Sequence, residues 1–267
     1  MGETLCRKLD GVSQCLDRHR PLQLSGAALK WIALVTMLID HIAAMCVATI
    51  EVWEWATLWN VWGIYSIMRG IGRTAMPIFM FLLVEGFFYT HNRWKHLGRL
   101  AVFALVAEIP FDLTIFGWFT WEHCSVITTM LICFAMLMAV DAILKLPAGE
   151  EKQGRFYGIW AGKIAGAAAV SALTLVLLTV IGADYTWCAG AMTLAFYLLR
   201  RWRWLAALAA YALLVLLDMS ELYAIVGILL ILCYNGQKGR QPKWLFYVFY
   251  PMHLFLLYLL RLWVFGA

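Results

Sequence analysis

Long apolar runs separated by short polar connections fill most of this chain. The first run, residues 30–48, is long enough to cross a bilayer, because about 20 apolar residues span the hydrocarbon core. The sixth to eighth runs are short, so we expect tilted helices or a locally thinned bilayer there. Together the runs predict an all-α bundle of about nine transmembrane helices, at residues 29–50, 65–90, 97–116, 124–145, 159–182, 185–199, 203–217, 221–234 and 244–265.

Residues 1–28 form a separate segment before the first run. Their charges are interspersed and no apolar stretch leads to a small-residue cleavage site, so we do not interpret them as a signal peptide. Leu5, Leu9, Val12 and Leu16 recur at helical spacing among basic residues, which predicts a short helix on a membrane surface. A solvated tail is the alternative. With no repeat or linker visible, residues 29–267 are predicted to form one transmembrane domain.

Basic residues test the division into spans, because Lys and Arg gather in cytoplasmic connections. Of the 21 Lys and Arg residues, all but Arg69, Arg73 and Arg261 lie in the segment up to Lys30 or in alternate connections further along. The intervening connections carry only acidic charges, at Glu51, Glu54, Glu122, Asp184, Asp218 and Glu221. The alternation predicts a multi-pass protein of the cell membrane with its N-terminus in the cytoplasm and its C-terminus outside.

The composition is typical of a membrane protein, and the cysteine spacing does not favour a metal site. The chain is 64% apolar with a mean hydropathy of +0.78, whereas soluble domains are about 45–50% apolar. Its seven Cys show neither a CxxC motif nor a metal-binding spacing, and a bridge between Cys124 and Cys188 is the one disulfide we consider. We predict no metal site and no nucleic-acid partner.

Asp40 and His41 lie near the middle of the first apolar run. Ionisable groups at that depth are costly and are functional candidates by default. An imidazole is the usual general base, and a carboxylate commonly fixes its tautomer, so we predict that Asp40 orients His41. The alternative is a structural hydrogen bond between helices.

The last apolar run carries a second buried histidine. Tyr247, Tyr250 and His253 are spaced three apart on roughly one face, and Pro251 disturbs the helix between them. Counted from the cytoplasmic end, His253 reaches a depth similar to that of His41. We therefore predict that the first and last spans bring both histidines to one cavity.

Two arginines of the second run also need partners. Arg69 and Arg73 are four apart on one face, and Arg73 lies deeper, where Asp40 or Glu108 is the expected counter-ion. Pro77 follows and should kink the span. The arginines are either part of the polar centre or structural.

Further acidic and aromatic residues lie toward the predicted outer side. Glu108 and Asp112 are four apart on one face of the third run, a pair that suits acid-base chemistry or cation transport. His123 precedes the fourth run and is either solvated or functional. Asp184 and Tyr185 form a short turn that could hold a substrate group. With Asp112 and His123, they are our candidate substrate-binding residues.

Basic connections on the predicted cytoplasmic side are candidates for phosphate binding. The segment YNGQKG, which begins at Tyr234, is a turn by its Asn-Gly content, and basic residues follow it. Such a loop can cradle phosphates, although every cytoplasmic loop is basic. The candidates for binding a phosphate-bearing cofactor are Arg93, Lys95, Arg99, Asn235, Lys238, Arg240 and Lys243, with Tyr250 deeper in the last span.

Four blocks together resemble one known family. KWIALVTMLIDHI, RGIGRTAMPIFMFLLVEGFFYT, RLAVFALVAEIPFDL and YNGQKGRQPKWLFYVFYPMHLFLLY occur in the order typical of the TraX family, whose namesake acetylates the N-terminus of conjugative pilin. The resemblance runs from Lys30 to Tyr258 and implies a transmembrane acyltransferase that uses cytosolic acyl-CoA. It also implies that the catalytic centre consists of Asp40, His41, Arg73, Glu108 and His253.

The chain departs from the family pattern toward the outer side. An Asn is common in the family where this chain has Ser125, and small residues are common where it has Thr186 and Trp187. These differences leave the donor side intact. They leave open whether the acceptor is a peptide such as pilin, a saccharide or a small molecule, and the oligomeric state is open as well.

We therefore expect an acyl-CoA-dependent membrane acetyltransferase that moves an acetyl group from acetyl-CoA to an amine or hydroxyl. His41 would act as base with Asp40 orienting it, while Arg73 or His253 stabilises the oxyanion, and an acetyl-histidine intermediate is the alternative route. The competing hypothesis is a proton-coupled transporter that uses the buried His, Glu and Asp residues. A noncatalytic scaffold would leave the buried charges unexplained.

Overall fold

The computed structural model describes residues 9–13, 15, 22–47, 58–115, 118, 123–147, 153–240 and 245–265. Within these ranges the chain is helical, with two isolated bridges at Leu24–Tyr234 and Cys124–Ala183 and no strand longer than that. The elements are α2 (Gly26–Ile42), η1 (Ala43–Val47), α4 (Leu58–Gly72), α5 (Ala75–Tyr89), α6 (Arg93–Ile115), α7 (Val126–Leu144), α8 (Gln153–Val180), α9 (Thr186–Leu198), α10 (Arg203–Leu217), η2 (Met219–Ala224), α11 (Ile225–Leu232) and α12 (Leu245–Phe265).

The described helices differ in length and in how apolar they are. Five segments are long and apolar enough to cross a membrane: Gly26–Val47, Trp62–Tyr89, Val126–Leu144, Gly158–Val180 and Phe246–Val264. Three further apolar stretches, Thr186–Leu198, Arg203–Leu217 and Met219–Leu232, are shorter. Each predicted run is mainly helical where it is described, so the prediction of an all-α membrane protein is confirmed. The count of nine crossings and the sidedness of the termini stay predictions.

The second predicted span is interrupted just before Pro77. Helix α4 ends at Gly72, and α5 begins at Ala75 after the turn at Arg73 and Thr74. Pro77 therefore lies in the first turn of α5, where a missing backbone N–H removes no intrahelical hydrogen bond. The interruption was expected at Pro77, but it lies one turn earlier. Arg73 is part of it.

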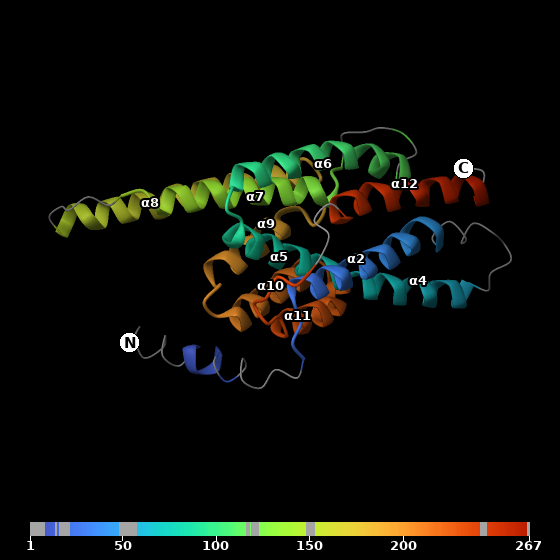
Figure 1. The fold of residues 1–267 in the computed structure, drawn as a ribbon, viewed down its shortest axis with the longest axis horizontal. Helices are drawn as coiled ribbons and strands as arrows, with labels where there is room; N and C mark the ends of the chain where they lie inside the picture. The colour runs from blue at the N-terminus through green and yellow to red at the C-terminus, as the bar shows by residue number, and fades with distance from the viewer. Residues whose placement is uncertain are drawn as a thin grey trace.

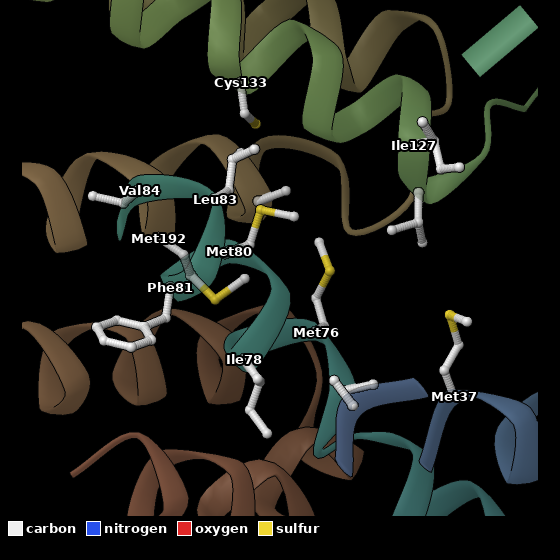
Figure 2. Packing of buried hydrophobic residues seen from close by; sticks show 14 of the residues in the cluster. Met37, Met76, Ile78, Met80, Phe81, Leu83, Val84, Ile127, Cys133 and Met192 are labelled. Carbon is white, nitrogen blue, oxygen red and sulfur yellow. The ribbon is translucent and has the colours of Figure 1, made fainter. Parts of the chain in front are cut away.

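Helix α5 lies in the middle of the bundle and is contacted by α2, α7, α9 and α11. Figure 2 shows Met80 and Leu83 of α5 pointing toward the helix that carries Cys133, while Ile78 points the opposite way. Met37, Met76, Met80 and Met192 are all buried in this core. Flexible thioether chains fill the gaps between helices, and such contacts stabilise a bundle by dispersion where lipid competes for apolar surface.

The first and last helices meet, which closes the bundle. Helix α12 packs along α6, and it also contacts η1 and α2. Figure 1 shows α12, α2 and α4 projecting together on the side away from the free end of α8. Residues far apart in sequence are thereby brought to one place.

The basic connections gather at one end of the bundle, which we call the basic end and define by residues 22–25, 90–92, 145–147, 199–202 and 233–240. Contacts join these connections to one another and to neighbouring helix ends: Leu24 N to Cys233 O at 2.9 Å, Arg200 Nε to Glu85 Oε1 at 3.2 Å, Arg93 to Asp141 Oδ2 at 2.5 Å and Arg203 to Tyr234 O at 2.5 Å. The charge alternation in the sequence therefore corresponds to a real clustering in space. Lys243 lies outside the described residues.

The N-terminal segment is helical at residues 9–13 and docks on the basic end. Asp10 bonds Arg201 at 2.5 Å and accepts from Trp202 Nε1 at 2.9 Å. These hydrogen bonds from Arg201 and Trp202 hold the pKa of Asp10 below its usual value. Residues 9–13 are therefore helical as predicted, and the position of this helix on a membrane surface stays a prediction. Cys124 and Cys188, the one disulfide considered, are both free thiols.

Replacing Gly227 by Ala should destabilise the bundle. A Cβ there would lie 2.6 Å from the Thr74 carbonyl oxygen and 3.0 Å from Pro77, so α11 and the start of α5 would have to separate. We expect a loss of about 1–3 kcal/mol, measured as a lower midpoint of thermal unfolding in detergent. The matched control is Gly98→Ala, at an exposed position of α6 with nothing within 4 Å of the added Cβ. An equal midpoint for both variants would contradict this packing.

Candidate functional site

His41 and His253 form a direct hydrogen bond inside the bundle. Nδ1 of His41 lies 2.7 Å from Nε2 of His253, and the two rings are nearly parallel, with centroids 5.0 Å apart. His41 is on the last turn of α2, and His253 is on α12, where it is 5% exposed. The prediction that the first and last spans bring both histidines together is confirmed by this contact.

A backbone carbonyl fixes the tautomers of the pair. Nδ1 of His253 lies 2.8 Å from the carbonyl oxygen of Phe249, and because a carbonyl only accepts, this nitrogen carries the proton. In the neutral pair, Nε2 of His253 then holds a lone pair, so His41 Nδ1 must be the donor between the rings. His41 is left with a basic Nε2. Both nitrogens of His253 are occupied, so it has no N–H for an oxyanion, and that part of the expectation is wrong.

Tyr250 packs beside both histidines. Its ring meets His41 edge to face at 6.2 Å between centroids and His253 at 5.5 Å, and it is 4% exposed. Residues 250 and 253 share one face of α12 as the spacing predicts, and Pro251 sits inside the helix between them. Tyr250 therefore helps to fix the pair. Its position there is deeper than the basic end, where the other predicted donor-binding residues lie.

Asp40 is paired with Arg69 and makes no described bond to His41. Arg69 donates to Asp40 Oδ2 at 2.6 Å, and Gly72 approaches the same carboxylate closely enough that a Cβ would overlap it. Asp40 Oδ1 is buried, and no hydrogen bond reaches it from the described residues. The prediction that Asp40 orients His41 is wrong, because neighbouring side chains on a helix point about 100° apart and Asp40 faces α4.

Arg73 has a counter-ion that was not predicted from the sequence. Its NH1 lies 2.9 Å from Glu221 Oε1 and 3.3 Å from the hydroxyl of Tyr185. Glu221 is 1% exposed, and in the described part of the chain nothing bonds its Oε2. The expectation that Asp40 or Glu108 pairs with Arg73 is wrong. Glu221 was assigned from the sequence to an acidic connection. Its position at the start of an apolar run was the only sequence signal that its side chain is buried.

The turn between α8 and α9 presents Tyr185 to this ion pair. Tyr185 and Thr186 have φ of 59° and 43°, a left-handed conformation that is costly for side chains other than Gly and unusual for a β-branched residue. Asp184 precedes them. Burial, with the neighbouring Asp40 carboxylate, raises the pKa of Asp184 to about 6, and Arg73 opposes part of that rise. Both candidates of this turn therefore join the polar centre.

Glu108 is directed to the start of α7. Its carboxylate accepts from the Ser125 amide at 3.1 Å, from the Ser125 hydroxyl at 2.8 Å and from the Thr128 hydroxyl. Ser125 is itself the N-cap of α7. Negative charge at a helix N-terminus is favourable, so these contacts make Glu108 a structural anchor. Asp112, one turn on, is 1% exposed, whereas His123 lies on the surface.

The polar centre lies where the short helices stop. Helix α9 has 13 residues and α10 has 15, so at about 1.5 Å per residue they extend only about 20 Å, less than the hydrocarbon thickness of about 30 Å. Tyr185 precedes α9 and Glu221 follows α10, and both meet Arg73. Helices α2, α4 and α12 extend together to one side (Figure 1).

The predicted phosphate-binding residues lie apart from this centre, at or beside the basic end. Arg93 is bonded to Asp141 and covers the ring of Phe87 at 3.8 Å, so it already has a structural partner. Lys95, Arg99, Lys238 and Arg240 are exposed. Asn235 accepts from the Gln237 amide at 2.9 Å and shapes its own turn. That these residues together bind a phosphate-bearing cofactor stays a prediction.

A known protein family matches most of the chain, and a curated relative matches about a third of it. A family model described as TraX protein matches residues 25–261. The "Probable fimbrial assembly protein FimC, serogroup H1" of Dichelobacter nodosus is 36% identical over 92 residues, which cover 34% of this chain and 33% of the relative. The chain therefore spans about a third of that relative's length. No solved structure matches the chain.

Removing one member of the Arg73–Glu221 pair should destabilise the protein strongly. Because Glu221 is almost fully buried, Arg73→Met or Glu221→Met leaves an unpaired charge, at a cost of about 3–5 kcal/mol. The double variant Arg73→Met/Glu221→Met should lose clearly less than the two single losses added together. Chemical or thermal unfolding in detergent measures the cycle, and strictly additive losses would contradict the pairing.

Proposed function

Since the chain belongs to the TraX family, we propose that it is an integral membrane acetyltransferase that takes acetyl groups from acetyl-CoA. The acceptor is an amine or hydroxyl presented in or across the membrane. The matching segment of a probable fimbrial assembly protein favours a protein subunit of a fimbria or pilus as the acceptor, with a saccharide or small molecule as the alternatives.

The observation that carries the proposal is the hydrogen-bonded pair of His41 and His253. A neutral imidazole whose second nitrogen is held by a fixed acceptor has the arrangement of a general base, with the other nitrogen ready to take a proton. In this pair, His41 Nε2 is the base and His253 is the positioning residue. The positioning role of His253 is the one that was predicted for Asp40 from the sequence.

In the proposed step, the acceptor nitrogen or oxygen attacks the thioester carbonyl of acetyl-CoA while its proton moves to His41 Nε2. The tetrahedral intermediate collapses with cleavage of the carbon–sulfur bond. The thiolate of coenzyme A then takes the proton from the His41 imidazolium and leaves as the thiol. An acetyl-histidine route, in which His41 Nε2 itself attacks the thioester, remains the alternative.

In this proposal, Arg69 and Arg73 stabilise the negative charge on the carbonyl oxygen. The described contacts of Arg69 and Arg73 each use NH1 alone, whereas a guanidinium offers five N–H donors. Their carboxylate partners fix the side chains before substrate binds, which is the condition for efficient oxyanion stabilisation. Asp40 Oδ1 and Glu221 Oε2, buried without a hydrogen bond from the described chain, suit the N–H or O–H groups of an acceptor.

The two substrates would enter from different sides of the protein. The basic end would face the cytoplasm of a cell membrane, by the rule for positive connections, and acetyl-CoA would enter there past Tyr247 and Tyr250. The acceptor would enter from the other side or from the lipid, where the short helices stop. The face of α12 that carries these tyrosines and His253 supports this route.

A proton-coupled transporter is the second candidate. The linked groups Arg73, Tyr185 and Glu221, with Asp184 beside them, favour it because neighbouring buried titratable groups can relay protons. Binding of acetyl-CoA to the purified protein, measured by calorimetry, separates the two. A transporter of an unrelated solute should not bind the thioester.

Replacing His41 by Ala should abolish acetyl transfer. We expect thiol release from acetyl-CoA, with a short peptide bearing a free N-terminus as the probe acceptor, to fall about 10²–10⁴-fold because the base is lost. The assay uses purified protein in detergent. The control is His91→Ala, at an exposed position of the basic end that plays no part in the proposed step. Near wild-type turnover by His41→Ala would remove His41 from the chemistry.

Replacements of His253 should have graded effects. His253→Gln places a carbonyl oxygen near the position of Nε2, so it can still accept from His41 Nδ1, whereas His253→Ala removes that acceptor. We expect His253→Ala to lower kcat about 10²-fold with little change in KM for acetyl-CoA, and His253→Gln to recover much of the loss. Equal losses in the two variants would show that His253 acts by packing alone.

A further inference from the structure

Three cations at the starts of α2 and α6 and in the loop before α12 lie close together. We call Lys30, Arg99 and Lys238 the cationic cluster. Ala27 N donates to the Lys238 carbonyl at 2.9 Å, and Lys30 follows Ala27 by one turn on the same face of α2. The Lys238 ammonium is close enough to Lys30 to repel it. Arg99 and Lys238 are exposed, and Lys30 is half-buried.

His96 adds a neutral donor beside two of these cations. Arg99 NH2 lies 3.3 Å from His96 Nδ1, and the Tyr247 hydroxyl lies 3.4 Å from the same nitrogen. Because a guanidinium only donates, Nδ1 accepts and the ring carries its proton on Nε2. Burial, with the positive charges of Arg99 and Lys30, lowers the pKa of His96 to about 4. The ring is therefore neutral at physiological pH, and no group of the described chain accepts from its Nε2–H.

Within the described residues, the cationic cluster has no carboxylate partner. None of the ion pairs there includes any of its three members. The described carboxylates near the basic end are bonded to other cations: Asp10 to Arg201, Glu85 to Arg200, and Asp141 to Arg93 and Lys145. Like charges at close range repel one another, so an anion bound among them is stabilised by all three.

The loop that carries Lys238 is fixed against the start of α2. Gly239 has φ of 71°, and a Cβ there would lie 2.6 Å from Oγ of Ser25, the N-cap of α2. Both conditions favour glycine, and they hold the chain directly after Lys238 in one place. The cations are thus positioned before a ligand binds, which lowers the entropy cost of binding.

The first turns of α12 lead from the cationic cluster to the histidine pair. Lys30 Nζ lies 5.3 Å from the centre of the Phe246 ring, and the next residue, Tyr247, contacts His96. Tyr247 and His253 are six residues apart, which is about 9 Å along the helix axis at about 1.5 Å per residue. A ligand that reaches both places carries its negative charge at one end of an extended arm.

We propose that Lys30, Arg99 and Lys238 bind the phosphate groups of the acyl-CoA donor. The Nε2–H of His96 supplies a further hydrogen bond to them. Neither Lys30 nor His96 was predicted from the sequence to bind the cofactor. This site rests on the proposed use of acetyl-CoA, but it holds the phosphates alone, so it does not depend on which group acts as the base.

Calorimetry with coenzyme A as the titrant tests the site without turnover, on the purified full-length protein in detergent. We expect Lys30→Gln to weaken binding about tenfold, because a charge-assisted contact with phosphate is lost. Lys145→Gln is the matched control and should bind as the wild type does, since Lys145 is a cation of the same end that bonds Asp141. Lys30→Arg keeps the charge and should restore most of the affinity, which separates loss of charge from misfolding.

Kinetics with two thioesters gives a second measurement. S-acetylpantetheine carries the same thioester as acetyl-CoA but no phosphate. We expect Lys30→Gln to raise KM for acetyl-CoA about tenfold with little change in kcat, because uniform binding is lost. The same variant should turn over S-acetylpantetheine as the wild type does.

Wild-type affinity of Lys30→Gln for coenzyme A would overturn the phosphate site and leave the proposed acetyl transfer standing. An equal loss in Lys145→Gln would also overturn it, because affinity would then follow the net charge of the basic end. So would phosphatidylglycerol retention, in native mass spectrometry, that Lys30→Gln loses while its affinity for coenzyme A is unchanged, since the cluster would then bind a lipid phosphate. No binding of coenzyme A by the wild-type protein would contradict the proposed function itself, and this site with it.

Discussion

A charged or polar group inside a helical membrane bundle must find its partner on another helix, because lipid offers none, and this constraint organises the centre of the molecule. His41 of α2 bonds His253 of α12, Asp40 of α2 bonds Arg69 of α4, and Arg73 bonds Glu221 of η2. Each pair joins segments distant in sequence. The same contacts that satisfy the polar groups therefore also close the bundle.

These pairs differ in which nitrogen and oxygen atoms they leave without a hydrogen bond. The Glu108 carboxylate is used up by the start of α7, and both ring nitrogens of His253 are occupied. His41 keeps one basic nitrogen, and Asp40 and Glu221 each keep one buried oxygen that no described group bonds. The atoms that can take part in chemistry are therefore the ones without a hydrogen bond from the described residues. The proposed acetyl transfer uses the basic nitrogen of His41 and assigns the two oxygens to the acceptor.

Several site residues were predicted from the sequence because burial of an ionisable side chain is visible in an apolar run. His41, His253 and Arg73 were found in this way, and the equal depth of the two histidines followed from counting residues. Tyr185 was predicted from its place with Asp184 in a short turn between two runs. Partner assignment failed because it depends on helix rotation. Adjacent residues such as Asp40 and His41 face different neighbours, and Glu221 was assigned to a connection although it is buried.

The sequence by itself determined that this is an all-helical membrane protein of the TraX family, with its basic connections alternating along the chain, since hydropathy and charge are properties of local segments. Only the tertiary structure decided which histidine keeps a free nitrogen, which carboxylate neutralises each arginine, and where the short helices α9 and α10 stop beside the polar centre. Those features depend on the rotation and packing of whole helices, and the packing joins α2 to α12 across more than two hundred residues of intervening chain.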